Sequence, residues 1–264
     1  MIKNINSKLC LSLLAILAFT VNFYFGSIGV FPIDTFAFFD SSYSMLNGNV
    51  PFRDYWTMNG PMIDVFQSLI FYIFGVSWQT YLLHSSLINV IFTLSTFVFL
   101  KDSGVGNKSN LFYSACTAIL AYPSVGVPFP DHHSSIFSII ALYNLVYAIK
   151  YEKKINWILI PVCLFIAFFC KQTPAAYFII FISIFLFCYS IFYKNYNWIT
   201  TVAVSVICLI LILFIIIKLN NINISEIIIQ YLLFPRTIGS ERMTNLEVNY
   251  KNLLFDFKFL YISL

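Results

Sequence analysis

Charged side chains are scarce in this sequence, since Asp, Glu, Lys and Arg make up only 10% of its 264 residues. Soluble domains average about a quarter charged residues, so this scarcity excludes an ordinary soluble globular domain. Hydrophobic residues make up 60% of the chain, and the mean hydropathy is +0.84. The fold class that we predict is therefore all-α, a polytopic helical membrane protein, with a bacterial inner or plasma membrane as the expected location.

Several motifs of known chemistry are also missing. The chain has no CxxC, HExxH or GxSxG and no phosphate-binding Gly-rich loop, so the usual signatures of thiol redox centres, zinc peptidases, serine hydrolases and nucleotide sites are absent. The net charge is only +4, and no run of Lys and Arg indicates a nucleic-acid partner. All six cysteines lie in apolar segments, which favours small buried side chains over chemistry: Cys10, Cys116, Cys163, Cys170, Cys188 and Cys208.

Apolar stretches of spanning length recur along the chain. They fall at about 9–30, 78–100, 110–128, 134–150, 155–170, 174–193 and 197–217. The first follows Lys3 and Lys8 as in a secretory signal, but no small-x-small cleavage site ends it, so we predict an uncleaved span. A further apolar stretch at 61–76 is shorter than the roughly 20 residues that a span needs. We predict that it forms an interfacial helix.

The lysines predict the orientation of the chain. If the N-terminus is cytoplasmic and 61–76 does not cross, one set of lysines faces the cytoplasm, as the positive-inside rule requires: Lys3, Lys8, Lys101, Lys108, Lys150, Lys153, Lys154 and Lys194. This model has about seven spans in a membrane domain, 1–217, whose first external loop, 31–77, carries short interfacial helices. The remaining segment, 218–264, is predicted to be extracytoplasmic, polar and irregular, except for an apolar helix from Glu226 to Phe234.

The first external loop concentrates acidic residues where a span meets water. Asp34 follows the first span directly, and Asp34, Phe38 and Ser42 are spaced i, i+4, i+8, which predicts a helix. Gly48 and a Pro-Phe-Arg-Asp-Tyr step then predict a turn, and Asn59-Gly60-Pro61 predicts the start of a second helix. Carboxylates at a membrane face are costly to keep there, so the loop is a candidate site.

These features resemble the first external loop of the membrane-embedded GT-C glycosyltransferases, the superfamily of protein mannosyltransferases and lipid A aminoarabinose transferases. The matching positions, in order, are Asp34, Leu46, Gly48, Pro51, Phe52, Asp54, Pro61 and Phe74-Gly75. Thr35 stands where the family often has a second acid, which leaves Asp40 or Asp54 as candidates for that role. The resemblance implies sugar transfer from a polyprenyl-phosphate-linked donor to an acceptor on the extracytoplasmic face, in contact with membrane lipid.

The candidate catalytic residues are Asp34, Asp54 and Asp131, with Asp40 as a candidate for substrate binding. A carboxylate in a partly dry cleft has the raised pKa that suits a general base. Structural alternatives stay open: Asp34 as a helix cap, Asp40 as a solvated loop acid and Asp54 as a turn residue or a partner of Arg53.

A second external loop contains Asp131-His132-His133, where the histidines are candidate ligands for a divalent metal. Capping of the following span by Asp131 or Ser134 is the alternative. Lys171, between two apolar runs on the external side, is a candidate for contacting a donor phosphate or for snorkelling to the interface.

The three arginines, Arg53, Arg236 and Arg242, all fall in predicted external loops. Arg binds phosphate through a planar fork, so they are candidates for donor binding. Two other functions compete with sugar transfer, namely a secondary transporter and a non-catalytic membrane protein or fragment of a larger glycosyltransferase. Transporters usually keep ionisable groups at mid-membrane, whereas the spans here are nearly free of charge.

Overall fold

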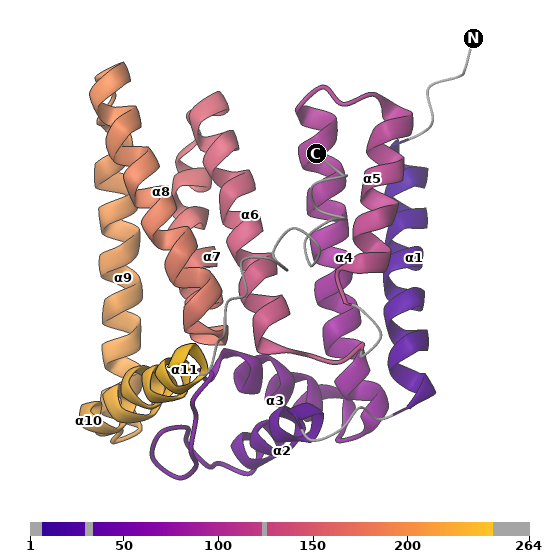
Figure 1. Cartoon of the computed structure of the whole chain (residues 1–264). Coiled ribbons are helices and arrows are strands. Elements are labelled where there is room, and N and C mark those ends of the chain that lie inside the picture. The colour runs from indigo at the N-terminus through magenta and orange to yellow at the C-terminus, as the bar shows by residue number, and fades with distance from the viewer. Residues whose placement is uncertain (1–6, 30–33, 123–125, 245–264) are drawn as a thin grey trace.

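The computed structural model describes residues 7–29, 34–122 and 126–244, and every regular element in those ranges is a helix (Figure 1). The elements, in chain order, are α1 Ser7–Ile28, α2 Asp34–Leu46, α3 Met62–Phe74, α4 Trp78–Asp102, α5 Asn107–Leu120, α6 Pro130–Tyr151, α7 Lys154–Cys170, α8 Gln172–Tyr193, α9 Asn197–Leu219, α10 Ile224–Ile227, the π-helix η1 Ile228–Leu233 and α11 Phe234–Thr244. The prediction of an all-helical chain is confirmed for these residues.

Five of the described helices are long and apolar enough to cross a membrane: α1, α4, α6, α8 and α9. The other two predicted spans coincide with α5 and α7, of 14 and 17 residues. At a rise of 1.5 Å per residue they extend about 21 and 26 Å, less than the roughly 30 Å of a bilayer core. Seven spans therefore remain a prediction, whereas five candidate spans are shown.

The upright helices form two groups that lie side by side (Figure 1). One group packs α1, α4 and α5 together, and the other packs α6, α7, α8 and α9. The groups meet along α4 and α6, and α3 contacts both α4 and α7. Exposed apolar side chains cover α9, of whose residues only Ser205 is buried, as expected for a helix that faces lipid.

The short helices gather at one end of these upright helices, which we call the loop end (Figure 1). It holds α2, α3, the chain between them, α10, η1, α11, the start of α6 and the junction of α7 with α8. At the opposite end, the lysine end, Lys150 donates to the Asp102 carboxylate at 3.2 Å and Lys101 donates to Ser7 Oγ at 2.6 Å. Helices are present where one was predicted from Asp34 and another at 61–76, as α2 and α3, at the end away from these lysines. Their interfacial placement stays a prediction.

Local sequence explains where these elements begin. Ser77 and Thr80 form a capping box that starts α4, and Pro130 occupies the first turn of α6. Gly60 has φ +91°, and a Cβ there would collide with the carbonyl oxygen of Phe169 on α7. Only glycine fits this position, so the chain entering α3 can pass directly against α7.

The region after α9 differs from the irregular segment predicted for 218–264. Residues Ile224–Thr244 are helical, through α10, η1 and α11. The helix expected from Glu226 to Phe234 is present, but the chain stays helical through Pro235, where an irregular segment was predicted. The π-helix η1 ends at Leu233, two residues before Pro235, and such wide turns are one way for a helix to absorb a local disruption. Residues 245–264 lie outside the described part.

Candidate functional site

The loop end brings together most of the charged residues predicted for a site. Asp54, Asp131 and Lys171 all lie there, with Arg53 beside Asp54. Asp34 is the first residue of α2; its side chain is outside the described part of the structure, as is that of Arg242. Asp40 on α2 and Arg236 on α11 are exposed.

Among the acids at this end whose side chains the structure describes, the most buried is Asp64, in the first turn of α3, with only 3% of its surface exposed. Ser41 Oγ donates to one carboxylate oxygen at 2.6 Å, and the Tyr55 hydroxyl donates to the other at 2.9 Å. Burial raises the pKa of Asp64 to about 6, although these hydroxyl donors oppose the shift. Burial, together with the nearby carboxylate, also raises the pKa of Tyr55 above its usual value. Asp64 on α3 is thus hydrogen-bonded to α2 and to the chain segment at Tyr55. With a pKa of about 6, its charge changes in the weakly acidic range.

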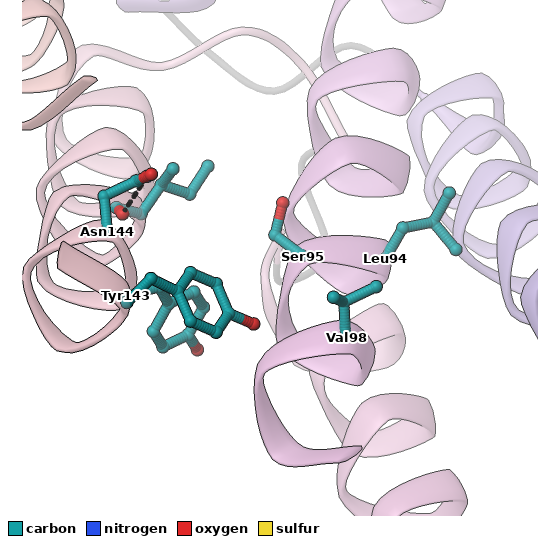
Figure 2. A pocket seen from close by; sticks show the side chains of 7 residues that line it. Leu94, Ser95, Val98, Tyr143 and Asn144 are labelled. Carbon is teal, nitrogen blue, oxygen red and sulfur yellow. Dashed lines mark hydrogen bonds between the residues drawn. The ribbon is translucent and has the colours of Figure 1, made fainter. Parts of the chain in front are cut away.

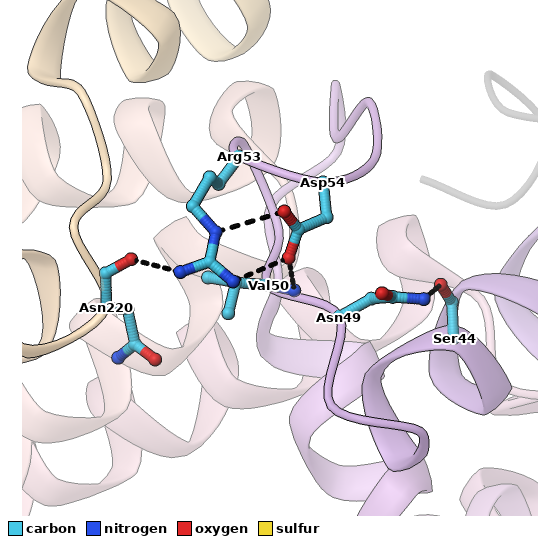
Figure 3. Close-up of polar contacts among 6 residues, drawn as sticks. All are labelled: Ser44, Asn49, Val50, Arg53, Asp54 and Asn220. Atoms are coloured by element: carbon cyan, nitrogen blue, oxygen red, sulfur yellow. Dashed lines mark hydrogen bonds and ion pairs between the residues drawn. The ribbon is translucent and has the colours of Figure 1, made fainter.

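Arg53 and Asp54 form a turn-stabilising pair (Figure 3). Two nitrogens of the Arg53 guanidinium donate to the Asp54 carboxylate at 3.0 and 2.8 Å, and a third donates to the carbonyl of Asn220 at 2.7 Å. The Val50 amide donates to Asp54 at 2.7 Å. The hydrogen bonds from Arg53 and Val50 lower the pKa of Asp54. A general base needs the opposite shift, so this geometry favours the structural interpretation of Asp54 over the catalytic one.

Asp131 and Lys171 pair where α6 meets the α7–α8 junction. The Lys171 ammonium lies 2.7 Å from Asp131 Oδ2, and both side chains are partly exposed, at 28% and 43%. Ser134 Oγ donates to the Lys171 carbonyl at 3.0 Å, so α6 fixes the backbone of this lysine as well. The alternative role, in which Asp131 or Ser134 caps α6, is not seen, since no side chain caps this helix. A partly exposed ammonium at a membrane boundary is suited to bind an anion.

A chain of buried polar side chains runs from α3 to α6, just inside the loop end. Gln67 Oε1 accepts from His84 Nδ1 at 3.0 Å, and His84 Nε2 lies 3.2 Å from His133 Nε2. The Tyr122 hydroxyl lies 3.1 Å from His133 Nδ1. An amide oxygen can only accept, so neutral His84 carries its proton on Nδ1. His133 Nδ1 also lies 3.1 Å from the Phe129 carbonyl oxygen. The chain joins α3, α4 and α6 through the interior.

His132 and His133 were predicted as metal ligands. Among the described residues, no group of three or more His, Cys, Asp or Glu is placed to hold an ion. Both ring nitrogens of His133 have partners within 3.2 Å. The ring of His132 stacks on Tyr122, and its Nδ1 is buried with no hydrogen-bond partner. The two adjacent histidines therefore have different surroundings, as their positions on one helix predict.

The C-terminal helices dock against the first loop through two glutamines. Gln230 on η1 donates to the carbonyl of Phe52 at 3.1 Å and accepts from the Thr57 amide at 3.0 Å. Gln172 donates to the carbonyls of Met58 and Tyr231 at 2.9 and 2.5 Å. The loop end is thus one connected structure, built from segments that are more than 170 residues apart in sequence.

Asp64, Gln67, His84 and Gln230 were not predicted as site residues. An acid in the first turn of an otherwise apolar helix was the available signal for Asp64. A histidine within an uncharged span was the signal for His84, which the sequence alone favours as an ordinary satisfied helix residue. Nothing in the sequence indicates the partner of Gln230.

No family model, curated protein or solved structure matches this chain.

Proposed function

We propose that this protein is a membrane glycosyltransferase that moves a sugar from a polyprenyl-phosphate-linked donor to an acceptor at the loop end. The observation that carries the proposal is the Lys171–Asp131 pair, partly exposed where α6 begins and α7 meets α8, at the end of the molecule that also holds α2 and α3. A lipid-linked donor presents its phosphate at the membrane surface, and an ammonium there can bind it as the sugar leaves. The resemblance of the first loop to GT-C enzymes supports the same reaction.

In this reaction Asp34 accepts the proton of the acceptor hydroxyl, and the oxygen bonds to the sugar carbon as the phosphate leaves. Lys171 exchanges Asp131 for the donor phosphate, and Arg236, exposed on α11, adds a second positive charge. Arg53 is already bound to Asp54 and to the backbone of Asn220, so its main contribution is to hold the loop.

The test is release of polyprenyl phosphate. The purified protein, in vesicles, receives a panel of polyprenyl-phosphate hexoses and pentoses with a bacterial membrane extract as the source of acceptors. We expect one donor to release polyprenyl phosphate, and Asp34→Asn to slow that release by about 10²-fold or more, because general-base catalysis contributes at least that much.

The matched control is Glu152→Gln, which removes an exposed carboxylate at the lysine end. It should retain near-normal transfer. Equal rates for Asp34→Asn and the wild type, at equal protein levels, would exclude Asp34 as the base, and inactivity with every donor would count against sugar transfer itself.

One observation favours a secondary transporter as the second candidate. The His84–His133 pair is buried between two candidate spans, where ionisable groups often take part in ion pathways. The two functions separate in the same vesicles, because a transporter moves solute without releasing polyprenyl phosphate.

A further inference from the structure

A pocket of about 290 Å³ lies between the C-terminal halves of α4 and α6 (Figure 2). It is lined by Leu94, Ser95 and Val98 on α4 and by Ile140, Tyr143, Asn144 and Tyr147 on α6. Figure 2 shows the Tyr143 side chain extending from α6 toward α4, whereas the end of Leu94 points away from α6. The walls of the pocket are therefore mainly apolar and aromatic. The pocket takes no part in the site at the loop end.

The two helices are fastened on either side of this pocket. His84 and His133 join them at the loop end, and Lys150 bonds the Asp102 carboxylate at the lysine end. Between these points the Tyr143 ring stacks on Phe99, with centroids 4.2 Å apart. The pocket thus belongs to a seam between the two helix groups, which is held at both ends.

The pocket lies at membrane depth. Leu94 is ten residues beyond His84 on α4, which corresponds to about 15 Å along the helix, within a hydrocarbon core of about 30 Å. Val98 is 48% exposed, so the pocket opens toward the surrounding membrane. Hydrocarbon, and not water, is the medium available to fill it.

The size of the pocket suits a short length of hydrocarbon. An apolar protein cavity of about 150 Å³ binds one benzene molecule. A pocket of about 290 Å³ therefore has room for roughly ten carbon atoms, the content of two isoprene units. The flat rings of Tyr143 and Tyr147 provide aromatic surface for unsaturated units.

We propose that this pocket binds part of the polyprenyl chain of the donor, an inference that rests on the proposed sugar transfer. Asp131, whose partner Lys171 would bind the phosphate, lies on the same helix as Ile140, nine residues and about 14 Å away. A chain whose phosphate is at Lys171 can run along α6 into the seam. The pocket therefore selects long isoprenoid carriers over short ones.

The first test measures occupancy without requiring transfer. A benzophenone-bearing amino acid replaces Val98, or Val204 on the lipid-facing surface of α9 as the control, in phospholipid vesicles that contain undecaprenyl phosphate. We expect crosslinks to undecaprenyl phosphate at position 98 at least tenfold above those at 204. Crosslinks at 98 to phospholipid alone, to a peptide of the same chain, or to undecaprenyl phosphate at equal yield would overturn the proposal.

The second test uses the transfer reaction. Val98→Trp fills the pocket, whereas Val204→Trp makes the same change on α9. We expect Val98→Trp to raise the KM for an eleven-isoprene donor at least tenfold and to leave a two-isoprene donor unchanged. Equal effects on both donors would overturn the proposal. Transfer with neither donor, even by the wild type, would defeat the proposed function and leave the crosslinks to decide the binding site.

Discussion

At the scale of single residues, the Asp64 carboxyl makes the stability of the folded protein depend on pH. Its pKa in the folded protein is about 6, above the ordinary value of 3.8, so the folded state holds its proton more tightly than the unfolded chain does. The stabilisation from this group is complete below about pH 4 and is lost as the pH rises through 6. The difference corresponds to about 3 kcal/mol between acid and alkaline conditions.

We therefore expect the Tm of the wild type in detergent to fall between pH 5 and pH 8 relative to that of Asp64→Asn, which cannot ionise. Asp40→Asn, an exposed acid on α2, is the matched control and should follow the wild type. Thermal unfolding of the three proteins across this pH range measures the effect. Parallel curves for Asp64→Asn and the wild type would show that Asp64 does not titrate there.

Sequence reasoning found the charged residues of the site better than the buried ones. It placed Asp131 and Lys171 on one external face, and the structure brings them within 2.7 Å. It did not single out Asp64, because burial depends on how α2 packs against α3, which the pattern of one helix does not contain. The roles of Asp54 and Arg53 were left open in the same way, since they depend on the distant carbonyl of Asn220.

At the scale of elements, Gln230 joins the C-terminal helices to the first loop. Its side-chain nitrogen donates to the Phe52 carbonyl and, at 3.1 Å, to the Glu226 carboxylate, and its side-chain oxygen accepts from the Thr57 amide. Replacement by leucine leaves these buried backbone groups without partners, at a cost of about 2–4 kcal/mol in the free energy of unfolding.

We expect Gln230→Leu to speed hydrogen–deuterium exchange in residues 50–57 and 224–233 and to leave α8 unaffected. Gln79→Leu, the same change at an exposed position on α4, is the control. Unchanged exchange in residues 50–57 would mean that the two segments do not depend on each other.

The helices α2 and α3 were predictable because their signals are local. The i, i+4, i+8 spacing from Asp34 and the Gly60-Pro61 start both correspond to described helices. The helical segment after Phe234 was missed because Pro235 indicates a break, whereas the π-helix before it lets the chain continue. The predicted span at 110–128 ends early, at Leu120, before a region with three prolines at 123, 128 and 130.

At the scale of the whole molecule, the charge distribution predicts orientation. The lysine end should face the cytoplasm and the loop end the exterior, by the positive-inside rule. In a variant without native cysteines, Asn49→Cys should react with an impermeant maleimide on intact cells, and Lys153→Cys only after permeabilisation. Both positions are exposed, so access depends on the side of the membrane. The reverse pattern would invert the orientation, and labelling of both on intact cells would exclude the seven-span model.

The buried hydrogen bond between His84 and Gln67 has a further consequence. Both side chains are buried, so the His84 Nδ1 proton exchanges with water when the packing around α4 opens. The rate at which this proton exchanges with water, measured by NMR, would give the frequency at which this packing opens.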